Sequence, residues 1–368
     1  MRVVFAVSTP HQAHLFRNTS MILQNRGDEV LFLARNYGYT ADILRSYNLP
    51  FRIYSRTYSG LLGKVLELLI SEVNGISLIG EFRPDVVVGD SLLGYPSLLF
   101  RVPSISFVDG DYSSFYEIQY RTLNRSSIIC TPYTFRTELG ARQIRYPGFQ
   151  QLAYLHPNRF RPDHGVLQTE GIGDKEAFSL IRFNAFDAIS HDLRYREYDW
   201  EVRRRVISLL QKSGRVLISS EGSLPVEFEH LKMKTNPSKI HSLLSYAKVV
   251  IAETSIATEA AILGTPSVLI HPSVSSNLAT NHLEMERFGL QRNFSNYQDA
   301  LPVIESIMKS DRRSFYSECH SRLLSNKIDV TPFVVWLIDK IAKDHESISQ
   351  EQIDFSQFIG NNGDIKNS

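Results

Sequence analysis

The chain has 368 residues, which is too long for one ordinary hydrophobic core and suits two domains of roughly 150–180 residues each. Its composition, 43% hydrophobic and 21% charged, is close to the soluble globular average and excludes wholesale disorder, collagen-like repeats and coiled coils. Forty Lys and Arg against 39 Asp and Glu leave a formal charge of +1. This balance argues against a large nucleic-acid footprint or a polybasic membrane surface, but not against a local basic pocket.

Cys130 and Cys319 are the only cysteines, so they cannot form a disulfide framework and suit a reducing compartment. The apolar run Val3–Val7 is too short for the core of a secretory signal. Charged side chains interrupt the longest apolar stretch, around Leu61–Ile79, and no segment is expected to span a membrane. We therefore expect a cytoplasmic protein, for which peripheral membrane contact stays open.

Apolar runs and amphipathic stretches alternate through the first half of the chain. Val3–Val7 is a β-branched run without polar alternation, as expected for a strand buried on both faces, and a helical pattern follows it up to Gly27. Further strands are predicted at Glu29–Ala34, Phe51–Tyr54, Val86–Gly89 and Ser104–Val108, and further helices at Tyr39–Tyr47 and Leu61–Phe82. This order predicts a parallel, doubly wound sheet that binds its ligand at the carboxyl ends of the strands.

Between Pro147 and Glu176 the pattern lapses into prolines and glycines, and we place the domain boundary there. The alternation then restarts, with strands predicted at Ala177–Phe183, Arg215–Ser219, Val249–Ala252 and Ser267–Ile270 and helices at Glu201–Lys212, Pro237–Tyr246, Ile256–Leu263 and Leu278–Phe288. The predicted organisation is an N-terminal Rossmann-like domain (1–150), a linker region (151–176), a C-terminal Rossmann-like domain (177–331), a helix (332–345) and a flexible tail (346–368). The two α/β domains are expected to face each other across a cleft.

The segment Val249–Pro272 carries the most informative pattern. A buried strand ends at Glu253, and Thr254 and Ser255 open a helix, where hydroxyls and unpaired N–H groups suit a phosphate. Glu259 lies about one turn further along, and its carboxylate is suited to accept both hydroxyls of a ribose. The alternative is that Thr254 or Ser255 only caps the helix and that Glu259 lies on a solvated face.

This strand–turn–helix resembles the donor-nucleotide motif of GT-B glycosyltransferases and of nonhydrolysing UDP-N-acetylglucosamine 2-epimerases, whose turn glycines are replaced here by Thr254-Ser255-Ile256. Over most of Met1–Ile341 the chain resembles the domain of unknown function 354 family, which is itself GT-B-like. The matching stretches are Thr9-Pro10-His11 with His14 and Phe16, Arg83–Val88, Tyr154–Pro157 with Phe160–Asp163, and the Ala-Ala-Ile-Leu-Gly-Thr-Pro run ending at Pro266. The resemblance implies the two-domain GT-B fold and a nucleotide-sugar substrate, UDP-linked.

His11 and His14 follow the first predicted strand, where no G-x-G-x-x-G motif for a dinucleotide occurs. They are three residues apart and share a helix face, from which His11 is suited to act as the base on an acceptor hydroxyl, with His14 contacting substrate. A metal pair is the rival hypothesis, but no third ligand stands at diagnostic spacing, and no metal is expected. The remaining alternative is a histidine that only caps the helix.

Three carboxylates follow two strands of the first predicted sheet: Asp90, Asp109 and, shortly beyond, Glu117. Because strand ends in one sheet converge, these groups could share the floor of the cleft and raise one another's pKa. The 2-epimerases carry acidic residues in similar surroundings, so the resemblance implies that the three would be catalytic in an epimerase. Asp and Gly at strand ends are also ordinary turn residues.

Polar residues also end the strands of the second domain. Arg182, followed closely by Asn184, could clamp a diphosphate bidentately, and Glu221 could meet the sugar or the base. The epimerases carry a His-Arg-Arg-Glu-Asn-like run near Arg182, whereas this chain has no histidine between Phe178 and Ser190. That departure argues against epimerisation.

The leading interpretation is a nucleotide-sugar-dependent glycosyltransferase in surface polysaccharide or glycan assembly. The donor diphosphate would lie on Arg182 and the Thr254-Ser255 helix start, with Glu259 on the ribose and His11 as the base. The expected partners are a nucleotide-sugar donor and a glycan or lipid-linked acceptor, without nucleic acid and without a cofactor.

Two alternatives belong to other classes. The first is a nonhydrolysing nucleotide-sugar 2-epimerase that uses the three carboxylates of the first domain. The second is a non-catalytic nucleotide-sugar-binding or scaffold protein, for which the missing glycines in both phosphate turns are the main argument.

Overall fold

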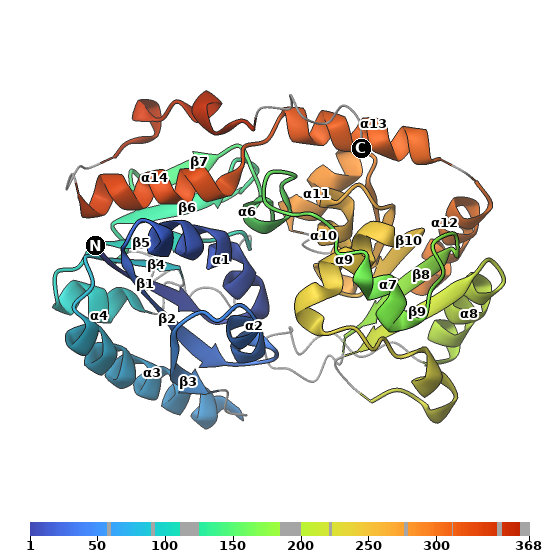
Figure 1. Ribbon diagram of the computed structural model, residues 1–368, viewed down its shortest axis with the longest axis horizontal. Helices are drawn as coiled ribbons and strands as arrows, with labels where there is room; N and C mark the ends of the chain where they lie inside the picture. The colour runs from blue at the N-terminus through green and yellow to red at the C-terminus, as the bar shows by residue number, and fades with distance from the viewer. Residues whose placement is uncertain are drawn as a thin grey trace. The chain divides into compact units, whose positions relative to one another are not determined.

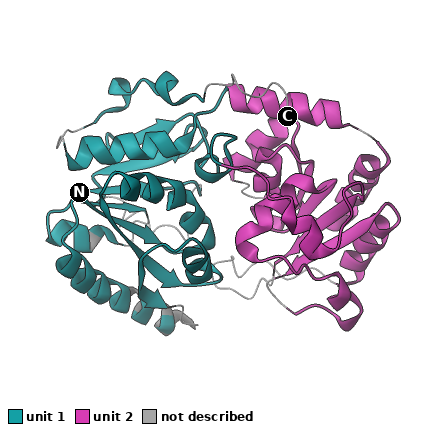
Figure 2. Ribbon diagram, viewed as in Figure 1, with its two compact units in different colours: residues 1–159, 326–368 teal, residues 160–325 magenta. Residues whose placement is uncertain are grey.

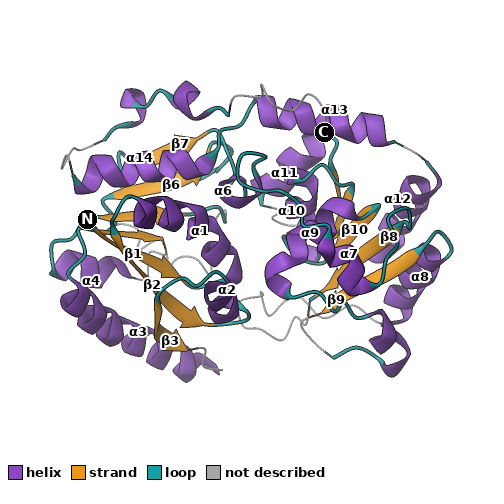
Figure 3. Cartoon of the chain, in the orientation of Figure 1, coloured by secondary structure: helices purple, strands orange, loops and turns teal. Residues whose placement is uncertain are grey.

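The computed structural model describes residues 1–56, 60–89, 93–110, 125–184, 200–220, 223–275, 279–310, 312–343 and 348–360. Asp90, Glu117 and Glu221, three of the predicted site residues, lie outside the described residues. The chain forms two compact units, Met1–Arg159 with Asn326–Ser368, and Phe160–Ser325 (Figure 2). Each unit contains one sheet of parallel strands flanked by helices (Figure 3).

The sheet of the first unit has the strand order β3-β2-β1-β4-β5-β6-β7, which reverses direction between β1 and β4. Its strands are β1 (Arg2–Val7), β2 (Glu29–Asn36), β3 (Phe51–Arg56), β4 (Val86–Gly89), β5 (Ser104–Phe107), β6 (Ile128–Pro132) and β7 (Gln143–Tyr146). Its helices are α1 (Pro10–Asn25), α2 (Thr40–Ser46), α3 (Gly60–Phe82), α4 (Gly94–Leu99), α6 (Leu152–Leu155) and α14 (Val330–Ala342), with short 3-10 turns η6 (Gln350–Gln352) and η7 (Phe355–Phe358).

β1 shows why both faces of this sheet are covered. Val3 to Val7 are all buried, and their side chains alternate between the two faces. Phe5 stacks on Phe16 of α1, whereas Val4 and Ala6 belong to the core beneath α3. Helices α1, α2 and α14 therefore lie on one side of the sheet and α3 and α4 on the other (Figure 1).

The segment after Asn326 returns to the first unit, where polar contacts hold it. Asp329 caps α14 and accepts a hydrogen bond from Arg159 at 2.7 Å, and Asp339 forms a bidentate pair with Arg26 at 2.6 and 2.8 Å. The compact units thus divide the chain at Arg159 and Asn326, whereas the sequence pattern places the limits at 150 and 331.

The sheet of the second unit has the order β12-β11-β10-β8-β9. Its strands are β8 (Phe178–Phe183), β9 (Arg215–Ser220), β10 (Val249–Ala252), β11 (Ser267–Ile270) and β12 (Gln291–Phe294). Its helices are α7 (Gly165–Glu170), α8 (Trp200–Gln211), α9 (Ile240–Tyr246), α10 (Ile256–Ile262), α11 (Thr280–Arg287), α12 (Tyr297–Lys309) and α13 (Arg313–Ser325), with 3-10 turns η3 (Val226–Leu231), η4 (Pro237–Lys239) and η5 (Pro272–Ser275). One core packs β8–β11 against α8 and α12, and the other packs β8–β10 against α7, α9 and α10.

The predicted α/β class with two doubly wound domains is confirmed. The strands predicted from apolar runs correspond to β1–β5 and β8–β11. Strands β6, β7 and β12 and helices α4, α6, α7, α12 and α13 were not predicted.

Candidate functional site

The turn between β1 and α1 places a histidine at the carboxyl edge of the first sheet. Thr9 is the N-cap of α1, and its side chain accepts the Gln12 N–H, while the Gln12 side chain accepts the Ser8 N–H at 2.7 Å. Pro10 occupies the first helical position, where its missing N–H costs nothing. His11 is therefore the second residue of the helix, directly after a hydrogen-bonded turn that needs no glycine.

His11 is held at both ring nitrogens. Its Nδ1 lies 2.9 Å from the Tyr154 hydroxyl, and its Nε2 lies 2.8 Å from Gln150 Oε1 and 4.0 Å from the Asp109 carboxylate. Because Gln150 Oε1 is only an acceptor, this arrangement places the proton of neutral His11 on Nε2 and leaves Nδ1 to accept from Tyr154. Asp109 follows β5, so His11 and Asp109 lie at the same edge of the first sheet; Asp90 and Glu117, which were predicted to converge with Asp109, lie outside the described residues.

His14 lies behind this group rather than beside it. The residue is buried, and its ring packs against those of Tyr47 and Tyr154, with centroids 6.0 and 5.4 Å apart. Through Tyr154 it supports the same residue that contacts His11. This packing position is one turn along α1, as the spacing predicts, but on the buried side of the helix.

At the carboxyl edge of the second sheet, Arg182 ends β8. It is half-buried, and its guanidinium donates to Ser219 Oγ on the neighbouring strand β9 at 2.6 Å. Asn184 is buried two residues later, and its N–H donates to the Glu253 carboxylate at 2.9 Å. Both residues therefore stand at the predicted edge, with Arg182 the more accessible of the two.

A buried ion pair that sequence patterns did not reveal joins α8 to the end of β10. Glu253 follows β10 and receives two hydrogen bonds from Arg203 of α8, at 2.9 and 2.6 Å, and one from the Tyr297 hydroxyl at 2.5 Å. Arg203 also lies over the Phe183 and Trp200 rings. Burial raises the pKa of the Glu253 carboxyl, and the Arg203 guanidinium opposes that change. The pair stabilises the ends of two central strands.

Helix α10 starts as the sequence predicts, but its side chains are placed differently. Ser255 is the N-cap and is exposed, without a side-chain capping bond, while Thr254 Oγ1 is buried and has no hydrogen-bond partner. Glu259 is only 6% exposed, and His241 of α9 lies 3.2 Å from its carboxylate. The alternative that Glu259 lies on a solvated face is therefore wrong, because α9 packs on α10 and covers this residue.

Other binding features are few among the described residues. They contain no group of three or more His, Cys, Asp or Glu side chains arranged to hold a metal ion. Within the same part of the chain, no helix is both long and apolar enough to cross a bilayer.

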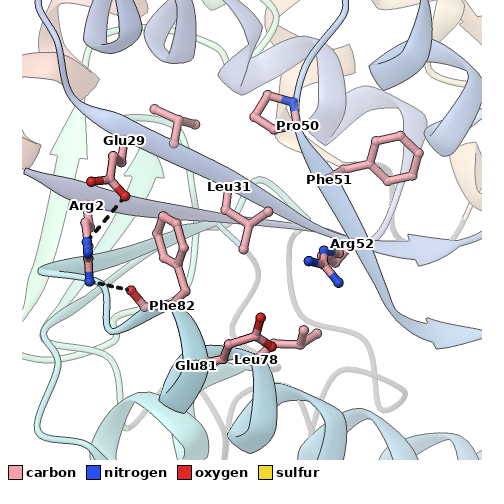
Figure 4. A pocket seen from close by; sticks show the side chains of 10 residues that line it. Arg2, Glu29, Leu31, Pro50, Phe51, Arg52, Leu78, Glu81 and Phe82 are labelled. Atoms are coloured by element: carbon pink, nitrogen blue, oxygen red, sulfur yellow. Dashed lines mark hydrogen bonds and ion pairs between the residues drawn. The ribbon is translucent and has the colours of Figure 1, made fainter.

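A pocket of about 490 Å³ lies in the first unit, at the amino ends of β1–β3 and the end of α3 (Figure 4). Arg2 lies at the margin of this pocket, where its guanidinium is 3.4 Å from the Glu29 carboxylate and donates to the Phe82 carbonyl at 3.2 Å. Ligands of doubly wound sheets bind at the opposite, carboxyl edge, where His11 and Asp109 stand. The pocket is therefore not the candidate active site.

Two doubly wound parallel units with polar residues at their carboxyl edges define a GT-B-type fold. Residues 3–309 match the model of the family described as protein of unknown function (DUF354), and the chain belongs to this family. No curated protein sequence matches the chain.

Solved structures with this fold include epimerases and glycosyltransferases. A putative UDP-N-acetylglucosamine 2-epimerase from Listeria monocytogenes is 11% identical with a TM-score of 0.69, over 95% of this chain and 98% of that one. The UDP-GlcNAc 2-epimerase from Neisseria meningitidis bound to UDP-GlcNAc is 14% identical with a TM-score of 0.61, over 92% and 100%. The calicheamicin glycosyltransferase is 14% identical with a TM-score of 0.56, over 93% and 99%. At these identities the likeness shows the fold alone.

Proposed function

We propose that this protein is a nucleotide-sugar-dependent glycosyltransferase in which His11 takes the proton from the acceptor hydroxyl. The observation that carries the proposal is the placement of His11 at the carboxyl edge of the first sheet, between Tyr154 and Gln150 and 4.0 Å from Asp109. An adjacent carboxylate favours the imidazolium that forms when the ring accepts a proton. A ring held at both nitrogens is also fixed in orientation, as a positioned base requires.

In this reaction the acceptor oxygen loses its proton to His11 and attacks the anomeric carbon of the donor sugar. The bond between that carbon and the diphosphate oxygen breaks, and the diphosphate leaves with the electron pair. Proton transfer occurs at Nδ1, the nitrogen that carries no proton in the neutral ring, once the acceptor hydroxyl replaces Tyr154 as its hydrogen-bond partner. Asp109 then stabilises the positive ring.

Donor binding is proposed for the carboxyl edge of the second sheet. Arg182 is half-buried there and suited to a departing diphosphate, and the unsatisfied Thr254 hydroxyl is suited to donate to one of its oxygens. Ser255, Asn184 and Glu259 belong to the same proposed site, with Glu259 on the ribose. We further propose a UDP-linked donor, a glycan or lipid-linked acceptor and a role in surface polysaccharide or glycan assembly.

A thermal-shift screen with UDP-, GDP-, CMP- and dTDP-sugars tests the donor, because a ligand at a hundred times its dissociation constant stabilises a fold by about 2.7 kcal/mol. Product analysis with and without an acceptor extract then tests the reaction. Release of nucleotide that depends on acceptor supports transfer. A sugar epimer formed without acceptor would show that the protein is an epimerase instead. Binding of a nucleotide sugar without either product would support the non-catalytic binding protein.

His11→Asn tests the base directly. Donor binding should persist, because it is assigned to the other unit, while turnover should fall by roughly a hundredfold or more. His230→Asn, at an exposed histidine of the second unit, is the matched control. A His11→Asn enzyme that keeps the parent's turnover would contradict the proposal.

A further inference from the structure

The outer face of α3 carries an unusual run of exposed apolar side chains. Leu66, Leu69, Val73 and Ile76 are 48%, 59%, 66% and 36% exposed, respectively. Their spacing of three, four and three residues puts them in one row along the helix, as in the a and d positions of a coiled coil. Another side of the helix, which includes Leu78, Ile79 and Phe82, packs in the core of the first unit. α3 is therefore apolar both toward the sheet and away from it.

The row continues onto α4. Leu98, Leu99 and Phe100 are 43–64% exposed, and a Cβ on Gly80 would lie 2.9 Å from the tip of the Phe100 ring. Phe100 thus covers α3 one turn beyond Ile76, and the two helices run along the same side of the sheet (Figure 1). The α3–α4 face comprises Leu66, Leu69, Val73, Ile76, Leu98, Leu99 and Phe100.

Such a concentration is not expected of a surface that faces water alone. The α3–α4 face contains seven of the fifteen large apolar side chains exposed in the described parts of the chain. Scattered single residues of this kind are normal, whereas a continuous patch marks an interaction site. A large apolar side chain gains about 1.5–3 kcal/mol on burial at about 25 cal/mol per Å², so seven half-exposed side chains present about 300–400 Å² of apolar surface to solvent. This matches the apolar core of an interface burying about 800 Å² per partner.

We propose that this face is the contact surface between two copies of the chain. The spacing along α3 is complementary to itself, because two antiparallel helices related by a two-fold axis would pair Leu69 with Val73 and Leu66 with Ile76. No charged side chain lies in the row, so no like charges meet across the axis. Leu98–Phe100 would extend the contact beyond each end of the paired helices.

Charge argues against a lipid surface as the occupant. α3 has three acidic residues, Glu67, Glu72 and Glu81, and one basic residue, Lys64. Arg83 and Arg101 lie near the ends of α3 and α4, whereas recognition of anionic lipids uses clusters of about four to eight basic residues. Lys64, Arg83 and Arg101 are fewer than such a cluster, and the exposed Glu81 near the end of α3 would be repelled by an anionic membrane.

The test is the mass of the full chain in solution, by light scattering after gel filtration and by sedimentation, over a series of micromolar concentrations. We expect the mass of two chains. Leu69→Glu should weaken the dimer roughly thirtyfold or more, because it buries an unpaired charge at the centre of the contact. Val226→Glu, at an 88% exposed apolar residue of the second unit, should leave the mass unchanged. Val226→Glu should melt with the parent. Leu69→Glu should unfold in one cooperative transition that no longer depends on protein concentration, because it loses only the stabilisation that association adds.

A second variant tests the pairing itself. Leu69→Glu/Val73→Lys should restore the dimer, because each new carboxylate would face the new ammonium of the other copy. A single-chain mass for the parent throughout the series would overturn the proposal. So would a dimer that Leu69→Glu leaves intact, or a monomer that sediments with vesicles of phosphatidylglycerol and phosphatidylcholine, which would make the face a membrane contact.

Discussion

Replacing Arg203 by Met should destabilise the second unit by about 3–5 kcal/mol, the usual cost of breaking a buried ion pair from one side. The substitution removes the hydrogen bonds of 2.9 and 2.6 Å to Glu253, whose side chain has no exposure to water. The Tyr297 hydroxyl and the Asn184 N–H remain as donors to that carboxylate. Met retains much of the apolar stem that packs on Phe183 and Trp200, so loss of packing contributes little.

The second step separates the pair from its surroundings. Arg203→Met/Glu253→Gln removes both charges and keeps an oxygen to accept from Tyr297, so it should be more stable than the sum of the single changes predicts. Residues that share one hydrogen-bond network couple by roughly 0.5–3 kcal/mol, and we expect a value in the upper half of that range here.

The assay follows urea unfolding by tryptophan fluorescence. The chain has two tryptophans, Trp200 beside Arg203 and Trp336 in α14. In a Trp336→Phe background, Trp200 reports the second unit alone. A single variant within about 1 kcal/mol of its background, or strict additivity in the double variant, would refute the idea that this buried pair holds the ends of β8 and β10 together.

Two further predictions concern titration. Burial raises the pKa of the Glu72 carboxyl to about 7, so the free energy of unfolding should fall as pH rises from 4.5 to 7. Glu72→Gln should remove this dependence and stabilise the chain at pH 8 by about 1 kcal/mol, after allowance for solvent screening. Urea titrations at several pH values measure both effects. Burial, and to a smaller extent the charge of His271, lowers the pKa of His282 to about 4. The free energy of unfolding should therefore fall by about 3 kcal/mol in total as pH drops from 6.5 to 4. His282→Asn should remove this fall, and a variant that keeps the parent's acid dependence would show that the ring is not buried in its neutral form.

Much of the fold could be predicted because parallel strands covered on both faces require continuous apolar runs. Val3–Val7, Val86–Gly89 and Val249–Ala252 are such runs, and all of their residues are buried. β7 and β12 escaped prediction because each lies at a sheet edge, where Gln143–Tyr146 and Gln291–Phe294 carry polar side chains that hide the strand pattern. At those positions tertiary pairing, rather than local composition, makes the strand.

The candidate site also combines residues that a topology rule predicts with residues that only the tertiary structure brings together. His11 and Asp109 could be brought together from sequence, because a rule of topology places the carboxyl ends of parallel strands at one edge. Tyr154 and Gln150 could not, because they lie about 140 residues from His11 and no spacing rule links them to it. Tyr154 stands in a stretch that the family resemblance had singled out, and that was the available signal. Arg203 resembles any other arginine of an amphipathic helix until the structure places it against Glu253.

Two carboxylates near the carboxyl edge of the second sheet already have partners within the second unit, and this limits the contacts that they can offer a nucleotide. Glu253 is occupied by Arg203, and Glu259 lies beside His241 under the cover of α9. A ribose that binds Glu259 must therefore displace part of a buried contact, so the carboxylate can contribute less net affinity than an exposed one would. Arg182, by contrast, is only half-buried and donates to the Ser219 hydroxyl on β9. Diphosphate recognition at Arg182 is accordingly the stronger part of the proposed donor site, and ribose recognition at Glu259 the weaker one.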